Sequence, residues 1–280
     1  LGPLNGADGE EALDYLVNLG IRMGFGDELV RIMGVKIIAD GSLGARTAWL
    51  SKPYSDDPGN NGYPNIGLDG LKRLVAKAHG AGLQVAIHSI GDRALDMVLE
   101  AYRSLVGVSA MRHRVEHASL TRDDQLVEIK RLGLAVSIQP RFAVSDWWAG
   151  ERLGTNRVKL LYRFKTMAEI GIPLGISTDS PVEPLNPWET VYAAISERKP
   201  SSAAAQKPIL GEALTIVDTL YYYTLGSAYI MHEERSLGTL EEGKLADFVV
   251  IDRDPLETPV EEITGIKVLE TYVGGEKVYG

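Results

Sequence analysis

Residues 83–105 read LQVAIHSIGDRALDMVLEAYRSL, and this stretch decides the fold. The apolar run Leu83–Ile90 predicts a buried strand, which ends before Gly91. The segment Arg93–Leu105 repeats apolar side chains every three or four residues, and this spacing predicts an amphipathic helix. A buried strand followed directly by a helix is typical of a parallel sheet that is covered by helices.

The same alternation of strand and helix extends on both sides of this stretch. Strands are predicted at 35–39, 83–90, 113–118, 134–139 and 173–178, and helices at 10–19, 27–33, 69–81, 93–105, 121–132, 158–170 and 187–197. Repeated units of this length imply parallel strands with right-handed crossovers. Five strands are therefore expected where a closed (β/α)8 barrel of the TIM type has eight, so that the barrel is partial in this chain.

The pattern changes after about residue 200. Residues 214–231 predict a helix, and 238–252 predict a turn followed by a buried strand. Residues 266–279, with Gly274-Gly275 in the middle, predict a β-hairpin. These strands fall outside the β-α alternation, so we expect them to form part of a small β-sandwich. The predicted domains are a barrel at 1–235 and this C-terminal β-unit at 236–280.

Composition narrows the class of protein. The chain has 280 residues, enough for one α/β domain and a smaller unit, and it is 45% hydrophobic and 24% charged, as soluble globular proteins are. Its net charge of -9 argues against a nucleic-acid surface, and no apolar run approaches the length of a membrane span. The chain has no Cys and therefore no disulfide or thiolate ligand, so a cytoplasmic location is expected.

Three polar side chains stand at the ends of predicted strands, namely His88, His117 and Asp179. Catalytic groups of parallel barrels gather at the C-terminal ends of the strands, so we expect these three to reach one metal ion. Imidazole and carboxylate ligands suit a divalent metal, with Zn the commonest, as one or two ions. The metal would lower the pKa of a water to about 7, and Asp179 would then act as the catalytic acid and base.

Three further residues are candidates for the site. Lys36 lies inside an apolar strand, where an ammonium is costly unless it is modified or paired. Carbamylation would make it a metal ligand, and an ion pair with Asp40 is the alternative. Arg46, in a long loop predicted at 42–68, is a candidate for binding a substrate carboxylate, and an ordinary surface role fits equally well. Trp147 is a candidate wall of a substrate pocket, with loop packing as the alternative.

Other polar residues are interpreted as structural. His113 lies deeper in its strand than the candidate ligand that follows it, and His79 lies near a helix C-terminus, where a cation suits the helix dipole. His232 belongs to a linker. Asp92 and Thr121 are each predicted to cap a helix N-terminus.

Five motifs taken together resemble the amidohydrolase superfamily. They are VKIIADGSLGARTA at 35–48, IHSIGDRA at 87–94, HRVEHA at 113–118, STDSPV at 177–182 and LGTLEEGKLAD at 237–247. The most similar branch is amidohydrolase family 3, which includes enzymes like N-substituted formamide deformylase. The resemblance covers nearly the whole chain, and it implies a metal-binding (β/α)8 barrel beside a β-sandwich built from both chain ends.

The resemblance also implies roles for single residues. Lys36 matches the strand-four lysine of the family, His88 and His117 match the histidines of strands five and six, and Asp179 matches the strand-eight aspartate. The family's His-x-His pair belongs upstream of Lys36, where this chain has 35 residues and no His. We therefore expect strands four to eight here, completed by an N-terminal segment of the same protein.

The motifs and the strand-end residues together predict a metal-dependent hydrolase. It would cleave C–N (amide-type) bonds of small molecules by means of a metal-activated water. One alternative is a non-catalytic remnant or ligand-binding partial barrel that lacks the His-x-His ligands, and another is a metal lyase or isomerase on the same scaffold. No nucleic-acid or membrane partner is expected, and a homodimer stays open.

Overall fold

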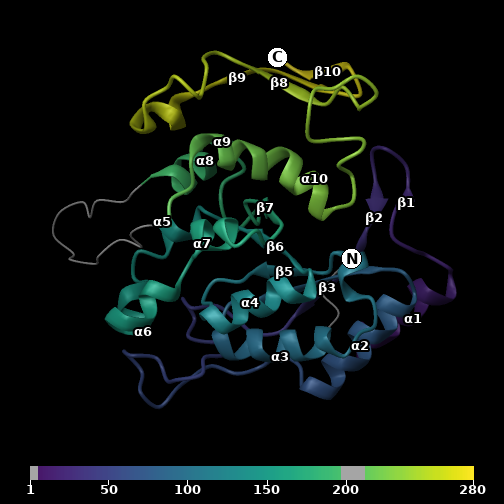
Figure 1. Ribbon diagram of the computed structural model, residues 1–280, viewed down its shortest axis with the longest axis vertical. Coiled ribbons are helices and arrows are strands. Elements are labelled where there is room, and N and C mark those ends of the chain that lie inside the picture. The colour runs from purple at the N-terminus through teal and green to yellow at the C-terminus, as the bar shows by residue number, and fades with distance from the viewer. Residues whose placement is uncertain (1–5, 197–211) are drawn as a thin grey trace. The chain divides into compact units, whose positions relative to one another are not determined.

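The five predicted strands of the parallel sheet all form. The computed structural model describes residues 6–196 and 212–280. Its strands are β3 (Gly34–Ile38), β4 (Gln84–Ser89), β5 (Arg114–His117), β6 (Ala135–Ile138) and β7 (Leu174–Ile176), in the order β3-β4-β5-β6-β7 (Figure 1). β4 pairs in parallel with both β3 and β5. The α/β class predicted from the sequence is therefore confirmed.

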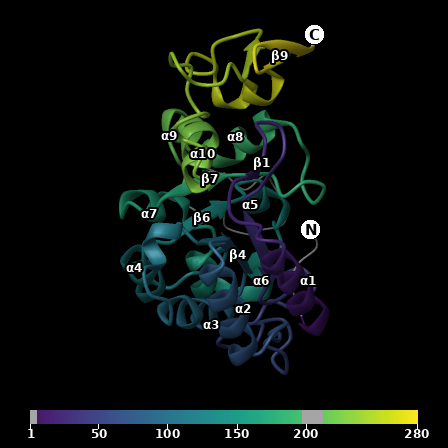
Figure 2. The ribbon, with the colours of Figure 1, turned by 90° about the vertical axis from the view of Figure 1, so that its right-hand side faces the viewer.

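Three helices follow these strands in the chain, as predicted. They are α2 (Leu68–Gly80), α3 (Asp92–Arg103) and α4 (Asp123–Leu132). α2 and α3 contact each other and β4, and they run side by side in both views (Figures 1 and 2). Gly133 ends α4 in the left-handed conformation, with φ at 65°. A glycine at this position avoids the penalty that a Cβ would bring.

The two faces of β3 differ in burial. Alternate residues of a strand point to opposite faces. Val35 and Ile37 of β3, together with Val85 and Ile87 of β4, are buried and belong to the core. Each such side chain contributes about 1.5–3 kcal/mol through the hydrophobic effect. Lys36 lies on the other face of β3, whose residues are only partly buried.

Two predicted helices are wrong. Residues 27–33 lie in a short hairpin of β1 (Phe25–Gly26) and β2 (Arg31–Ile32), whose turn is held by the Asp27 carboxylate. That carboxylate accepts hydrogen bonds from the N–H of Leu29 and of Val30, a turn that competes with helix.

The predicted helix at 158–170 is broken into η2 (Val158–Leu160) and α7 (Phe164–Glu169). Between these two pieces, Leu161 is extended and forms an antiparallel bridge with Leu120, and Tyr162 is left-handed with φ at 55°. Pairing with a distant segment therefore replaces the local helical preference.

The chain divides into two compact units. The first unit comprises 1–136, 148–163 and 169–172, and the second comprises 137–147, 164–168 and 173–280. The remaining helical segments are α1 (Gly6–Asn18), η1 (Val108–Met111), α5 (Phe142–Ser145), α6 (Ala149–Arg157), α8 (Pro187–Ile195), α9 (Ile216–Tyr221), η3 (Tyr222–Gly226), α10 (Ser227–Ile230) and η4 (Val260–Gly265). In the described ranges, no helix combines the length and the apolar character that a membrane crossing needs. The predicted domain boundary at 235/236 stays a prediction.

The second unit contains a separate antiparallel sheet. Its strands are β8 (Phe248–Ile251), β9 (Val268–Val273) and β10 (Glu276–Tyr279), in the order β10-β9-β8. The β9–β10 hairpin predicted from the sequence is confirmed. The rings of Phe248 and Tyr272 stack with centroids 4.5 Å apart, and the Asp247 carboxylate accepts a hydrogen bond from Gly274 N–H at 2.7 Å. Both contacts hold β8 to the end of β9.

Candidate active site

Two histidines meet at the ends of neighbouring strands in the first unit. The ring centroids of His88 in β4 and His117 in β5 lie 4.5 Å apart, with the rings inclined at 71°. The register places His117 beside Ser89, one residue out of step with His88. A regular strand would turn the two rings to opposite faces. The left-handed backbone of His117, with φ at 75°, breaks this alternation at the strand end.

One ring nitrogen of His88 already has a defined partner. Its Nε2 lies 3.0 Å from the carbonyl oxygen of Gly41. A carbonyl oxygen can only accept, so Nε2 carries the proton and Nδ1 of the neutral ring keeps its lone pair. His88 is therefore prepared to bind a cation through Nδ1.

Lys36 is half-buried, and its register partner on β4 is Ala86, two residues before His88. The register therefore places Lys36 on the same face of the sheet as His88. The ion pair of Lys36 with Asp40, which was the alternative, does not form: within the described residues the Asp40 carboxylate contacts backbone N–H groups and His88 instead.

Arg46 is engaged inside the long loop, which comprises residues 42–67. Its guanidinium binds both carboxylate oxygens of Asp56, at 3.3 and 2.9 Å, and Arg152 binds the same carboxylate. The hydrogen bond from Arg46 is the main cause that lowers the pKa of Asp56. Because its guanidinium is paired with Asp56, Arg46 would have to leave that carboxylate before it could bind the carboxylate of a substrate.

Trp148, the neighbour of the candidate Trp147, packs beside the long loop in the first unit. The Arg152 guanidinium lies 5.3 Å from the centroid of the Trp148 ring, and a Cβ on Gly44 would lie 3.2 Å from that ring. Trp147 belongs to the second unit, and its side chain is 64% exposed. The substrate role of Trp147 stays a prediction.

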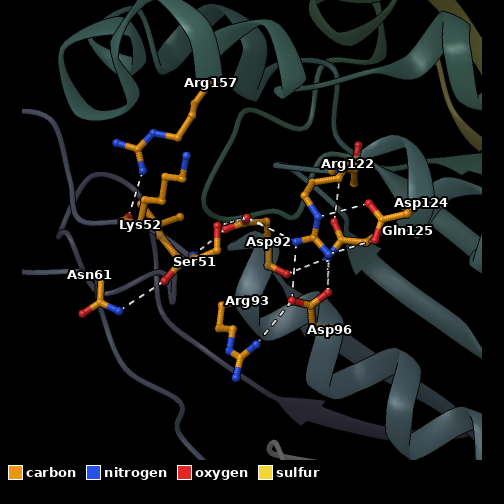
Figure 3. Close-up of polar contacts among 12 residues, drawn as sticks. Ser51, Lys52, Asn61, Asp92, Arg93, Asp96, Arg122, Asp124, Gln125 and Arg157 are labelled. Atoms are coloured by element: carbon orange, nitrogen blue, oxygen red, sulfur yellow. Dashed lines mark hydrogen bonds and ion pairs between the residues drawn. The ribbon is translucent and has the colours of Figure 1, made fainter.

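A polar cluster fastens the long loop to the starts of two helices (Figure 3). The Asp92 carboxylate accepts hydrogen bonds from the N–H of Ser51, at 2.8 Å, and from its hydroxyl. Arg122 donates to Asp92 at 3.3 Å and to Asp96 at 2.5 Å. Burial lowers the pKa of Arg122, but its hydrogen bonds to carboxylates, first of all to Asp96, outweigh burial and raise it.

This cluster corrects two predicted helix caps. Gly91 is the N-cap of α3, and Asp92 is the first residue of the helix, with its side chain turned to the loop. Arg122 is the N-cap of α4 in place of Thr121, and its N–H donates to Gln125 Oε1 at 2.9 Å. For Asp92, the distant Ser51 takes the side chain that local sequence would assign to capping, whereas the buried Thr121 hydroxyl has no hydrogen-bond partner among the described residues.

The second unit holds Asp179, which follows β7 in the left-handed conformation with φ at 56°. Its carbonyl oxygen accepts a hydrogen bond from Val182 N–H at 2.9 Å. Arg141, which follows β6, donates to Glu189 at 3.2 Å and lies 3.7 Å from Glu183, so ion pairs stabilise the segment after Asp179. The convergence of Asp179 with the two histidines stays a prediction.

The donor atoms of the site fit a metal in part. Two imidazoles at one strand edge are suitable ligands, but catalytic zinc sites usually have three protein ligands. Within residues 6–196 and 212–280, no group of three His, Asp or Glu side chains is arranged to hold an ion. The two imidazoles are thus fewer than the ligands that a catalytic zinc site needs, and their role as metal ligands stays a prediction.

Sequence reasoning overlooked Asp40 as a site residue. It considered this aspartate only as a partner for Lys36, although Asp40 stands at a strand end as His88 and His117 do. Its complete burial and its contact with His88, at 3.4 Å, make it part of the same site. A carboxylate at a strand end, directly before a glycine, was the available signal.

Comparison with known proteins gives a consistent result. The sequence pattern of the amidohydrolase family matches residues 3–279. YtcJ from Bacillus subtilis (strain 168) is 34% identical over 251 residues, which are 89% of this chain and 47% of YtcJ. The N-substituted formamide deformylase of Arthrobacter pascens is 30% identical over 210 residues, which are 72% of this chain and 38% of that protein.

A solved structure shows the same similarity in three dimensions. An uncharacterized metal-dependent hydrolase from Pyrococcus horikoshii OT3 matches with a TM-score of 0.80 and 44% identity, over 90% of this chain and 50% of that chain. The strands of the parallel sheet are thus part of a TIM-type barrel, as the sequence predicts. The chain spans half or less of the length of these relatives.

Proposed function

This chain belongs to the amidohydrolase family, and from that premise we propose that it contributes to a metal-dependent hydrolase of C–N bonds in small molecules. The observation that carries the proposal is the approach of His88 and His117 to 4.5 Å between ring centroids at adjacent strand ends. A relative named N-substituted formamide deformylase supports amide-type substrates, formamides among them.

His88 and His117 would hold a divalent cation, with zinc as the first choice for imidazole ligands. Such a cation, when bound, supplies the acidity that lets water react as hydroxide near neutral pH. Asp179 would take the proton from that water and pass it to the leaving nitrogen, as a positioned general acid and base. The hydrogen bond from Nε2 of His88 to Gly41 keeps the ring oriented for its role.

We propose that the remaining ligands come from a further segment of the same protein. Two facts support this source: the described residues hold no group of three ligands, and the relatives are about twice as long as this chain. A second copy of the chain is the other outcome that a test can reveal. A cytoplasmic location also stays a prediction.

The decisive experiment measures bound metal and amide hydrolysis in the complete gene product. We expect His88→Asn, His117→Asn and Asp179→Asn each to lower kcat/KM by at least about 100-fold, and the two histidine variants also to lose zinc. The matched control His232→Asn changes a histidine outside the site and should keep both. A folded wild type that holds no metal and hydrolyses no amide would support the non-catalytic remnant.

Carbamylation of Lys36 is a separate part of the proposal. Its support is the position of Lys36 on the face of the sheet that also carries His88. If a carbamate bridges two ions, protein prepared with added bicarbonate should bind about two ions, and protein depleted of CO₂ about one. Equal metal content in both preparations would argue for an unmodified lysine.

A further inference from the structure

The carboxylate of Asp40 is fully buried and lies directly after β3. Its Oδ2 accepts hydrogen bonds from the N–H of Trp49 at 2.9 Å and of Gly91 at 2.8 Å. Its Oδ1 accepts from the N–H of Ile90 at 3.0 Å and lies 3.4 Å from Nε2 of His88. Burial of a carboxylate is costly unless hydrogen bonds replace its water, and three backbone donors do so here.

These hydrogen bonds join the end of β3, the turn after β4 and the long loop. Trp49 is held from both sides, because its carbonyl oxygen accepts hydrogen bonds from Arg93 N–H at 3.1 Å and Ala94 N–H at 3.2 Å. A glycine is needed at position 91, since a Cβ there would lie 2.0 Å from the Trp49 oxygen. A shift of the loop at Trp49 therefore disturbs the turn that follows His88.

The same group of acceptors limits how the His88 ring can turn. Gly41 O lies 3.0 Å from Nε2, and Asp40 Oδ1 lies 3.4 Å from it. Since both neighbours accept hydrogen bonds, they favour the tautomer with the proton on Nε2. Acceptors that bind the far nitrogen of a histidine ring fix its orientation and typically raise its affinity for a metal ion.

We propose that Asp40 is a positioning residue that couples the place of the long loop at Trp49 to the tautomer and orientation of the His88 ring. The inference rests on the proposed function only in so far as His88 holds a metal. Displacement of Trp49 then weakens metal binding, although Trp49 itself is no ligand. One buried carboxylate thus sets both the position of the loop at Trp49 and the orientation of the His88 ring.

The test compares Asp40→Asn with Asp92→Asn in the complete gene product. An amide at position 40 replaces one acceptor with a donor that faces a backbone N–H, whereas Asp92→Asn weakens the anchor of the same loop at Ser51 and leaves His88 untouched. Zinc affinity, measured by competition with a chelator, should fall about 10–100-fold in D40N and less than about 2-fold in D92N. Unchanged affinity in D40N overturns the coupling, and an equal loss in D92N overturns the role of Asp40 in it, because loosening the loop alone would then be enough.

A second readout needs neither metal nor substrate. NMR of the metal-free protein labelled with ¹⁵N-histidine reports the His88 tautomer, which should be Nε2–H in the wild type and in D92N and mixed in D40N. A wild type that binds no zinc would refute the proposed function, while this tautomer shift would still decide the role of Asp40.

A further variant covers the case in which D40N does not melt cooperatively. Gly91→Ala then replaces it, because the added Cβ displaces the Trp49 carbonyl and leaves the carboxylate in place. We expect a mixed His88 tautomer in the folded G91A protein. An unchanged tautomer in that protein overturns the proposal.

Discussion

Arg122 is the residue on which the cluster of Figure 3 depends, because its guanidinium lies among three carboxylates. Gln125 adds hydrogen bonds to the carbonyl oxygen of Asp92 at 2.7 Å and to Asp96 at 2.8 Å. Asp92 is almost fully buried, so its negative charge needs the guanidinium of Arg122 as a partner. Removal of one partner from a buried pair costs more than the pair contributes, because the other charge stays without compensation.

We therefore expect Arg122→Met to lower the free energy of unfolding by about 2–3 kcal/mol, below the full cost of breaking a buried pair because Arg122 is partly exposed. The matched control is Arg93→Met, which removes a more exposed arginine 3.7 Å from the same Asp96 and should cost less than about 1 kcal/mol. Urea unfolding of both variants measures the difference. Equal losses would mean that the buried charge of Asp92 does not need Arg122.

Glu128 gives a pH-dependent prediction at the residue scale. Hydrogen bonds from Arg131, and then from Arg103, lower the pKa of Glu128 to about 2. The pKa is lower in the folded state than in the unfolded chain, so this stabilisation is present above about pH 4.3 and is lost as the pH falls towards 2. At pH 7, Glu128→Gln should lower the free energy of unfolding by about 1 kcal/mol, a value discounted for solvent screening.

The comparison of wild type and E128Q by denaturant unfolding, from pH 7 down to the acid limit of folding, tests this sign. The difference in free energy of unfolding between wild type and E128Q should become smaller below about pH 4.3, because protonated Glu128 and glutamine are both neutral. A difference that stays constant across this range would show that the ion pairs of Glu128 add nothing to stability.

Helix ends give the clearest prediction at the scale of the element. Gly133 ends α4 with φ at 65°, and a Cβ there would lie 2.6 Å from the Cβ of Ser109. Gly107 has a similar φ of 73°, but a Cβ there would meet open space. The two glycines therefore separate the cost of backbone strain from the cost of a steric clash.

We expect Gly107→Ala to lower the free energy of unfolding by about 1 kcal/mol, from the left-handed backbone alone. Gly133→Ala should cost about 2–3 kcal/mol, because the clash with Ser109 adds to the same strain. Thermal and urea unfolding measure both variants side by side. If Gly133→Ala lowers the free energy of unfolding no more than Gly107→Ala does, then η1 moves away from the added Cβ without a loss of stability.

At the scale of the whole molecule, apolar surface remains open in the second unit. The sheet β10-β9-β8 exposes on one face the side chains of Val249, Leu269, Val273 and Tyr279. Exposed apolar patches and free strand edges favour association. The open face agrees with the expectation, implied by the family resemblance, that this β-unit is part of a β-sandwich built from both chain ends.

Residues 1–280 expressed alone should therefore aggregate or melt without cooperativity, and should bind zinc weakly. The complete gene product should be monodisperse and should melt sharply. Light scattering, calorimetry and metal analysis of the two proteins test this expectation. A monodisperse, sharply melting 1–280 fragment with tightly held metal would contradict it and also the proposed source of the missing ligands.

The five parallel strands, the three helices α2 to α4 and the β9–β10 hairpin could all be predicted from local sequence, because the side chains that each element buries recur with the period of that element. Local sequence also placed His88 and His117 at the ends of their strands. These features depend on residues near one another in the chain. The family followed from motifs of the same local kind.

The hydrogen bonds between distant segments could not be read from local sequence, because they depend on how the chain folds back on itself. Gly91 N–H binds Asp40 from 51 residues away, and Ser51 N–H binds Asp92 from 41 residues away. Local pattern assigned Asp92 to a helix cap, and it assigned Leu161 to a helix that a bridge to the distant Leu120 interrupts. Buried hydrogen-bonding groups must find partners wherever the folded chain supplies them, and no local period encodes that choice.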